Sequence, residues 1–251
     1  MNVEQKEKNW NKNPFLLRVI GMGTAYFVKT PWWLKKIYPS YTWNIRTNEK
    51  VIYLSFDDGP HERATPFVLD ELKKYNAKAS FFCIGKNVVA HPDLYKRILE
   101  EGHTTGNHTH HHLNGWKTTD EEYLKDVAEA AKYIDSSLFR PPYGKIGSFQ
   151  ARNIAAAMKY PVSKIIMWDV LSGDFDNSIT NEQCLENVVL NTKKGSIVVF
   201  HDSEKAFPLL EYCLPRTLDF FSKKGYRFEG LLKLEEKAAN GEKKVLVSDR
   251  T

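Results

Sequence analysis

The stretch Val51-Ile52-Tyr53-Leu54-Ser55-Phe56, followed directly by Asp57-Asp58-Gly59-Pro60, decides the fold. Its β-branched and aromatic residues predict a buried strand, and the Gly-Pro pair requires the chain to turn afterwards. Outward from this strand, apolar runs alternate with amphipathic helical patterns at intervals of about thirty residues, the size of a βα unit. We expect further strands near 78–84, 104–107, 138–140, 162–168, 196–200 and 226–230, and helices over 65–75, 92–101, 119–133, 148–159, 181–192 and 208–223. This alternation predicts a parallel α/β sheet or barrel.

Length and composition indicate one domain with two flanking segments. The chain has 251 residues, of which 42% are hydrophobic and 13% aromatic, enough for a sizeable core. We expect an N-terminal extension over 1–49, helical or partly disordered and packed on the barrel. The main domain is expected over 50–230, and a polar tail over 231–251.

Charge and cysteine spacing exclude several classes of protein. The net charge is +5, but the lysine pairs are scattered rather than gathered in one basic run, which argues against nucleic-acid binding. A weak attraction to an anionic wall polymer or membrane surface is compatible with this charge. Cys83, Cys184 and Cys213 are far apart and form no CxxC pair, so neither a disulfide framework nor a thiolate zinc site is predicted.

The N-terminal stretch does not have the pattern of a secretory signal. Its apolar part, Phe15–Val28, is interrupted by Arg18, is followed by no small-residue cleavage site and is too short to span a membrane. A cytoplasmic or peripherally membrane-associated protein is therefore expected. The segment Trp32-Trp33-Leu34 is interpreted as a packed helix in preference to an interfacial anchor. Translation from Met22 instead of Met1 is a further hypothesis.

The reactive residues follow the expected strands. Asp57 and Asp58 end the first strand, and His108 follows the third. Arg140 ends the fourth, Asp174 lies shortly after the fifth, and His201 ends the sixth. In a βα barrel the carboxyl ends of the strands open onto one face, where active sites are built. The topology alone therefore brings these segments together.

Two histidines in this set suggest a metal site. His108 and His112 are four residues apart, which places them on one side of a helical turn. Two imidazoles and one carboxylate are the ligand pattern of a catalytic zinc site with room for water. The alternative is an incidental histidine-rich surface loop. The adjacent carboxylates Asp57 and Asp58 favour the metal, because a cation commonly accompanies such a pair.

Acid and base catalysts can be assigned within the same set. Asp57 can serve as a base while Asp58 binds metal, since consecutive side chains leave a turn in different directions. His201 is placed to act as an acid. A structural His201-Asp202 pair is the alternative for that residue.

Four motifs in this order resemble the polysaccharide deacetylases, carbohydrate esterase family 4, which share the NodB-homology domain. The resemblance covers about residues 50–230, and four motifs in order are far more specific than any one of them. The motifs are Ser55-Phe56-Asp57-Asp58-Gly59-Pro60, His108-Thr109-His110-His111-His112, Arg140-Pro141-Pro142-Tyr143-Gly144 and Val199-Phe200-His201-Asp202.

The resemblance implies a distorted (β/α)7 barrel, similar to a TIM barrel, that uses a divalent metal, usually zinc, with cobalt or another metal as a substitute. By resemblance Asp57 is the catalytic base and His201 the acid, Arg140 orients the base, and the Tyr143 N–H contributes to the oxyanion site. The implied metal ligands are Asp58, His108 and His112, and the implied substrate contacts are Pro141, Val199 and Phe175.

One further family motif, beyond these four, is altered here. In Trp168-Asp169-Val170-Leu171-Ser172-Gly173-Asp174-Phe175, Asp174 matches an aspartate that pairs with the arginine or assists the acid. Leu171 replaces a common aspartate, and Phe175 replaces a common tryptophan, which changes the expected substrate subsite. Asp169 and Asp176 are interpreted as turn aspartates rather than replacements.

The resulting hypothesis is the hydrolysis of N-acetyl, or less favourably O-acetyl, groups on a polysaccharide or oligosaccharide. A glycan-binding module with a relict metal site, and a C–N hydrolase acting on a small amide, are the alternatives. Peptidoglycan, chitin-like oligomers, xylan and surface glycans are all compatible with this sequence, and the oligomeric state is not predicted. The resemblance also leaves the localisation open, because this family often acts outside the cytoplasm.

Overall fold

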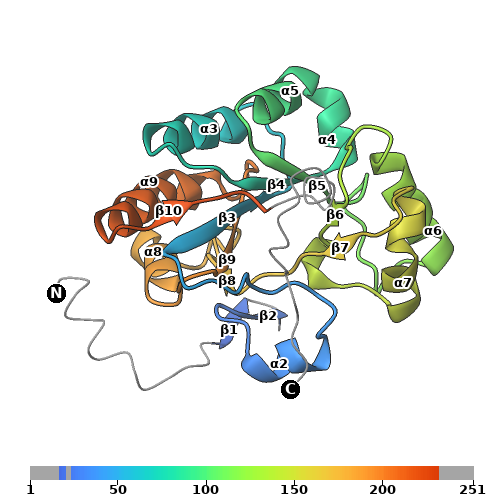
Figure 1. The fold of residues 1–251 in the computed structure, drawn as a ribbon, viewed down its shortest axis with the longest axis horizontal. Coiled ribbons are helices and arrows are strands. Elements are labelled where there is room, and N and C mark those ends of the chain that lie inside the picture. The colour runs from blue at the N-terminus through green and yellow to red at the C-terminus, as the bar shows by residue number, and fades with distance from the viewer. Residues whose placement is uncertain (1–16, 21–23, 232–251) are drawn as a thin grey trace.

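Strand β3 (Val51–Asp57) lies inside the sheet, between two neighbouring strands, as its apolar sequence predicts. Six of its seven residues are buried. The structure is a computed structural model that describes residues 17–20 and 24–231, with helices surrounding the strands (Figure 1). The strands run in the order β7-β6-β5-β4-β3-β9-β8, and β10 pairs with the start of β3. Every pair in this sheet is parallel. The predicted distorted (β/α)7 barrel is confirmed.

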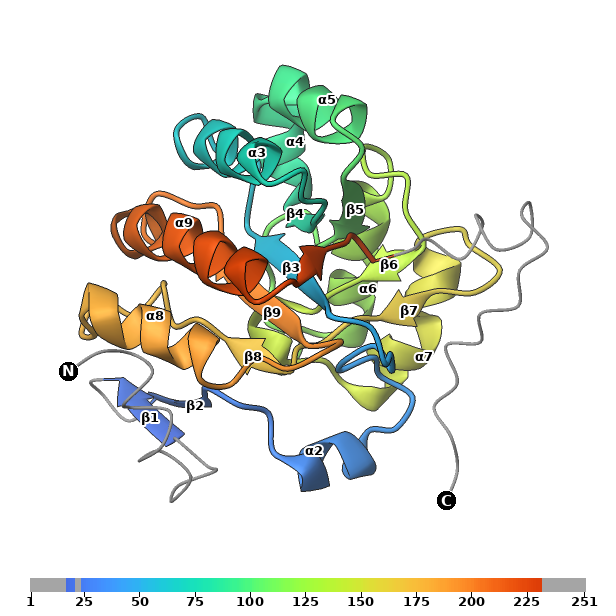
Figure 2. The ribbon, with the colours of Figure 1, turned by 60° about the vertical axis from the view of Figure 1, so that its left-hand side comes forward.

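The remaining elements follow the predicted alternation. The strands are β4 (Ser80–Cys83), β5 (Thr104–Asn107), β6 (Leu138–Phe139), β7 (Lys164–Ile165), β8 (Val170–Leu171), β9 (Ile197–His201) and β10 (Arg227–Phe228). The helices are α3 (Ala64–Lys74), α4 (Gly85–Ala90), α5 (Pro92–Glu100), α6 (Asp120–Ala130), η1 (Pro142–Gly144), α7 (Ser148–Ala157), α8 (Asn181–Val189) and α9 (Phe207–Lys223). In Figure 2, α3, α9 and α8 cover one side of the strands, and α6 and α7 cover the other.

Three expectations about these elements were wrong. The run expected as one strand over 162–168 forms only the two-residue β7, and a separate strand β8 follows it. Helix α4 was not expected, because six residues that begin with glycine have little intrinsic helical preference. Residues 17–27, expected to be helical or partly disordered, contain two antiparallel strands, β1 (Leu17–Ile20) and β2 (Thr24–Phe27).

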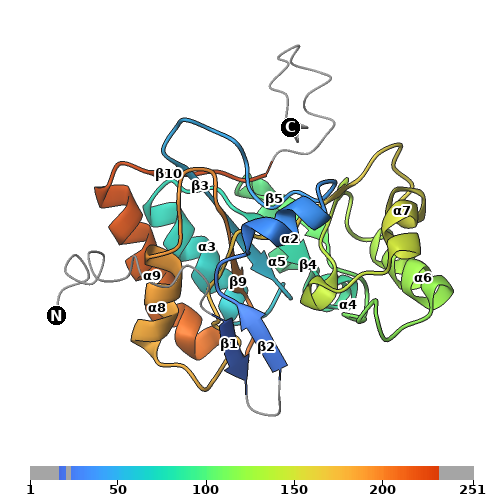
Figure 3. The ribbon, with the colours of Figure 1, turned by 90° about the horizontal axis from the view of Figure 1, so that it is seen from below.

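The segment after β2 contacts both ends of the curled sheet. Lys29 pairs with Val170 of β8, and Thr42 pairs with Ile166, directly after β7. Figure 3, which views the molecule from below, shows β1, β2 and the helix α2 (Trp32–Ile37) in front of the sheet. The segment therefore bridges the gap between the outer strands.

Helix α2 itself packs less than expected. Leu34 contacts a core cluster, but Trp32 and Trp33 are 62% and 42% exposed. The prediction of a packed helix was therefore wrong for the two tryptophans. The hypothesis about Met22 and most of the predicted tail lie outside the described residues, within which no helix is long and apolar enough to cross a membrane.

The core lies directly beneath the predicted site. Phe56 stacks against Phe81 at 5.1 Å and against Phe200 at 6.0 Å between ring centroids, and all three rings are buried. These residues occupy three neighbouring strands, and two of them immediately precede Asp57 and His201. Buried aromatic packing of this kind fixes the strand ends from which the reactive side chains project.

Candidate active site

The carboxyl ends of neighbouring strands bring the predicted residues together. Asp57 is the last residue of β3 and lies in register with His201, the last residue of β9. His108 follows β5, and Arg140 follows β6. The convergence expected from barrel topology is therefore present.

Arg140 forms a fully buried ion pair with Asp57. Its Nη1 donates to Oδ1 of Asp57 at 2.6 Å and to the hydroxyl of Ser55 at 2.9 Å. Its other nitrogens donate to the backbone oxygens of Ile166 and Met167, both at 3.1 Å. The guanidinium is thus held from four directions, and it fixes the orientation of the Asp57 carboxylate.

Asp58, His108 and His112 form a cluster of potential metal ligands. Their ligand atoms lie within 4.8 Å of one another. Oδ1 of Asp58 is 3.2 Å from Nε2 of His112 and 3.8 Å from Nε2 of His108. Asp58 can reach this position because its backbone is left-handed, with φ of 82°.

The protonation pattern of the cluster fits a cation. Nδ1 of His108 is 2.7 Å from the carbonyl oxygen of Arg140, which can only accept, so Nδ1 carries the proton and the Nε2 lone pair faces Asp58. Burial lowers the pKa of His108 to about 4, which keeps the ring neutral. Oδ1 of Asp58 is buried without a well-formed hydrogen bond to any described residue. Electron-rich atoms that converge without a donor between them suit a divalent metal.

The ionisation of Asp58 also favours a cation at this cluster. Burial raises the pKa of this carboxyl, but the neighbouring His112 and the positive charge of His201 outweigh burial and lower it overall. Asp58 is therefore a carboxylate at neutral pH, as a metal ligand must be.

His201 is paired with Asp174. Oδ1 of Asp174 is 2.8 Å from Nδ1 of His201, and Oδ2 accepts the backbone N–H of His201 at 2.7 Å. Burial lowers the pKa of His201, but the charge and hydrogen bond of Asp174 outweigh it and raise the pKa to about 9. The sequence left two partners open for Asp174, and the structure places it beside the histidine, whereas Arg140 contacts Asp57.

The other predicted residues lie around these groups. Tyr143 is 60% exposed, has a left-handed backbone with φ of 60°, and its hydroxyl is 3.1 Å from Nδ1 of His112. Pro141 is buried directly after Arg140. Val199 is buried in β9, in register with Leu171 of β8. Leu171 thus adds apolar surface beside Val199 where the family commonly has a carboxylate.

Phe175 packs against the histidine and against the N-terminal segment. Its ring centroid is 5.1 Å from His201 and 5.2 Å from Tyr26, and the Tyr26 hydroxyl donates to Asp176 at 3.0 Å. Sequence reasoning missed Tyr26, because no local signal links residue 26 to residue 175. Asp176 also accepts from the backbone and hydroxyl of Ser178, as expected for a turn aspartate.

Asp202 is a second contributor that sequence reasoning did not use. Its carboxyl accepts from the backbone N–H of Gly59 at 3.1 Å and from the hydroxyl of Thr65 at 2.5 Å. A Cβ on Gly59 would lie 2.0 Å from Asp202, so only glycine fits this close approach. The contact anchors the turn that carries Asp58.

The other two histidines of the second motif lie apart from the cluster. The backbone N–H groups of His110 and His111 both donate to Asp126, and Nδ1 of His111 is 2.5 Å from the same carboxylate. They hold the loop against α6. Only two of the four histidines in the tract therefore belong to the candidate metal site.

The fold and the site together define a barrel hydrolase with a candidate metal centre at its strand ends, and comparisons with known proteins give its family. Residues 44–163 match the family model described as polysaccharide deacetylase. A peptidoglycan-N-acetylglucosamine deacetylase of Bacillus cereus is 37% identical over 192 residues, which cover 74% of this chain and 89% of that protein. The chain belongs to the polysaccharide deacetylase family.

Two further comparisons agree with this placement. The peptidoglycan-N-acetylglucosamine deacetylase PgdA of Listeria monocytogenes is 34% identical over 190 residues, which are 73% of this chain but 38% of that protein. The crystal structure of the Bc1960 peptidoglycan N-acetylglucosamine deacetylase superposes with a TM-score of 0.71 at 30% identity, covering 80% of this chain and 95% of that one.

Proposed function

We propose that this protein removes N-acetyl groups from the amino sugars of peptidoglycan, with a divalent metal, assigned as zinc, held by Asp58, His108 and His112. The observation that carries the proposal is the Asp58-His108-His112 cluster, with the Arg140-Asp57 and Asp174-His201 pairs at the ends of adjoining strands. The substrate is inferred from the two relatives described above, which are peptidoglycan deacetylases.

The bound metal would polarise the acetyl carbonyl and make a water molecule more acidic. Asp57 accepts the proton of the attacking water, and Arg140 keeps its carboxylate fixed at Oδ1 while no described residue hydrogen bonds to Oδ2. His201 then donates a proton to the departing nitrogen, and Asp174 keeps that imidazole oriented and charged.

The remaining residues shape the site for an acetyl group. In this proposal the backbone N–H of Tyr143 donates to the oxygen on which negative charge develops. Val199 and Leu171, both buried and in register, provide an apolar wall for the methyl group. Phe175 confines His201 from the other side. O-deacetylation uses the same groups and is the less favoured reaction.

Acetate release by the purified, zinc-supplied protein tests the proposal. Substrates are peptidoglycan, N-acetylglucosamine oligomers, acetylated xylan and small N-acetyl amides. The control is Asp57→Asn, with its fold checked by circular dichroism and its metal content measured. We expect release from peptidoglycan that falls by a factor of about 10² to 10⁴ in the variant while metal stays bound.

The alternatives give different results in the same assay. Glycan binding without acetate release from any substrate would indicate a binding module with a relict site. Release from small amides but from no glycan would indicate a small-amide hydrolase. Either result would overturn the proposed reaction.

A further inference from the structure

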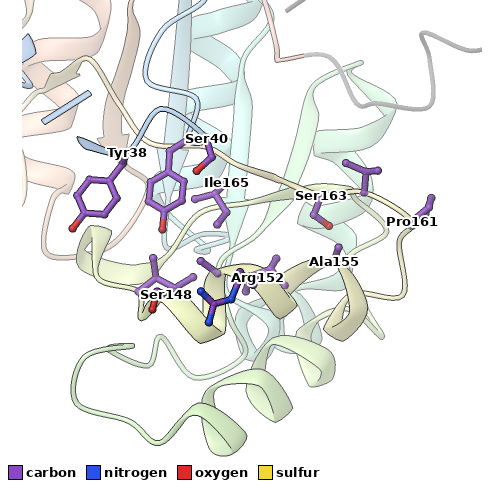
Figure 4. Close-up of a pocket in the computed structure, with 13 residues that line it drawn as sticks. Tyr38, Ser40, Ser148, Arg152, Ala155, Pro161, Ser163 and Ile165 are labelled. Carbon is purple, nitrogen blue, oxygen red and sulfur yellow. The ribbon is translucent and has the colours of Figure 1, made fainter. Parts of the chain in front are cut away.

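A cavity lies between helix α7 and the residues that follow α2, outside the site described above. Its volume is about 570 Å³, and Tyr38, Tyr41, Ser148, Arg152 and Ser163 contribute to its wall (Figure 4). We call it the α7 cavity. Its apolar part comes from small and branched side chains of α7 and of the residues before β7. Mixed apolar, aromatic and sparse polar walls are typical of ligand sites.

The charge of the α7 cavity has one sign. Arg152 is exposed and forms no ion pair or side-chain hydrogen bond with any described residue. No aspartate or glutamate lines the cavity, and the first turn of α7 contains no acidic residue. An unpaired guanidinium in a cavity without carboxylates favours an anionic ligand, and its planar fork suits a carboxylate.

The aromatic and hydroxyl groups suit a sugar. Tyr38 and Tyr41 are stacked, with ring centroids 5.4 Å apart and an angle of 8° between planes. Tyr38 is 42% exposed, so part of this rigid pair remains open to contact. This aromatic pair therefore offers a face on which a sugar ring can pack.

The α7 cavity is close to the active site along the chain. Ser148 follows Tyr143 by five residues, so their Cα atoms are at most about 18 Å apart. Exposed Trp116 lies beside this connection, because its Nε1 donates to the backbone oxygen of Ile146, which also lines the cavity. A few linked sugar residues can span such a distance.

We infer that the α7 cavity binds a carboxylate-bearing sugar of the same glycan strand whose acetyl group is removed at the active site. Arg152 pairs with the carboxylate, and Tyr38 and Tyr41 contact the ring. The inference rests on the proposed function and deepens it: the enzyme distinguishes acidic wall glycans from neutral amino-sugar polymers outside its catalytic centre.

The test compares two oligosaccharides of equal length, one neutral and built of N-acetylglucosamine, and one from peptidoglycan with free carboxylates. For Arg152→Gln we expect KM for the acidic substrate to rise roughly tenfold, with kcat unchanged and the neutral substrate unaffected. Tyr38→Ala should raise KM for the acidic substrate with kcat likewise unchanged. Arg216→Gln, which alters an exposed arginine on α9, is the matched control and should change neither constant.

Calorimetric binding of the acidic oligosaccharide separates this inference from the proposed function. Weaker binding by Arg152→Gln than by the wild type supports the cavity even if no acetate is released. Equal binding by the two proteins overturns it, as does a KM change that is the same for both substrates. Loss of acetate release from every substrate, with this binding difference intact, would contradict the proposed reaction alone.

Discussion

The His201-Asp174 pair sets the protonation state of the proposed acid. Since the pKa of His201 is raised to about 9, the imidazole is charged at neutral pH and loses its proton only as the pH rises through that value. A step that needs the charged form is therefore fully supported below pH 9 and is lost above it.

Asp174→Asn should therefore move the alkaline limb of the rate profile. Without the carboxylate charge, the pKa of His201 falls from about 9, because only the smaller contributions of Asp58 and Asp57 then oppose burial. The measurement is kcat/KM as a function of pH for both proteins. An alkaline limb at the same pH in the variant would contradict the proposed role of the pair.

Asp57 has a structural role besides the proposed chemical one. Asp57→Asn removes the only carboxylate paired with the buried guanidinium of Arg140 among the described residues. Leaving such a charge unpaired costs about 3–5 kcal/mol of unfolding free energy. Urea unfolding measures this loss. Ser55→Ala removes one hydrogen bond to the same guanidinium and one to the backbone oxygen of Val198, and it should cost less, about 2 kcal/mol. Equal losses of unfolding free energy in the two variants would show that the charge of Asp57 is not the main source of the stabilisation.

At the scale of elements, the N-terminal strand β2 supports the loop that carries Asp174 and Phe175. Phe175 lies between the rings of Tyr26 and His201 in the part of the chain that the structure describes. Tyr26→Ala should let Phe175 shift and lower kcat by roughly tenfold, since such aromatic pairs contribute about 0.5–1.5 kcal/mol beyond area burial. Tyr26→Phe keeps the ring contact and loses the hydrogen bond to Asp176, so it should retain most activity. Steady-state kinetics measure kcat for both variants. An identical decrease in kcat would contradict the proposed role of the aromatic contact.

The sequence predicts long apolar strands better than short strands. Strands β3 and β9 are apolar runs that end in reactive residues, so both their extent and their carboxyl ends were predictable. Strands β7 and β8 have two residues each and depend on neighbours for pairing, including Thr42 and Lys29 from the N-terminal segment. Such pairing is a tertiary effect that no local pattern records.

The site residues likewise divide into those that a local pattern predicts and those that depend on tertiary contacts. Asp57, Asp58, His108 and His201 were identifiable because topology places every strand end on one face. The partner of Asp174 could not be predicted, because the sequence offers both Arg140 and His201. Only the distances in the structure distinguish these two candidates. Tyr26 could not be predicted at all, since it enters the site from outside the alternating βα pattern.

At the scale of the whole molecule, Asp169 holds the N-terminal segment on the barrel. Its carboxylate is 2.5 Å from Nζ of both Lys29 and Lys35, and Ser196 donates to it at 2.5 Å. Burial raises the pKa of Asp169, but the two ammonium groups outweigh it and lower the pKa overall. The contribution to stability is therefore present above the ordinary aspartate pKa of about 3.9 and is lost as the pH falls below it.

Asp169→Asn should lower the free energy of unfolding at pH 7 by about 3 kcal/mol, because two partly buried lysines lose their counter-ion. Urea unfolding between pH 3 and 7 should show the variant and the wild type converging at the acid end. Asp70→Asn, which removes an exposed partner of Arg97, is the control and should have little effect. A constant difference across this pH range would contradict the role of the charge.

The central claim is that Asp58, His108 and His112 hold a divalent metal required for deacetylation. The most direct measurement is acetate release from peptidoglycan by chelator-treated protein as zinc is added, with bound zinc counted in parallel. We predict that activity is absent without metal and saturates at one zinc per chain, and that Asp58→Asn binds zinc at least tenfold more weakly. Full activity in metal-free protein, or unchanged zinc affinity in Asp58→Asn, would contradict the claim.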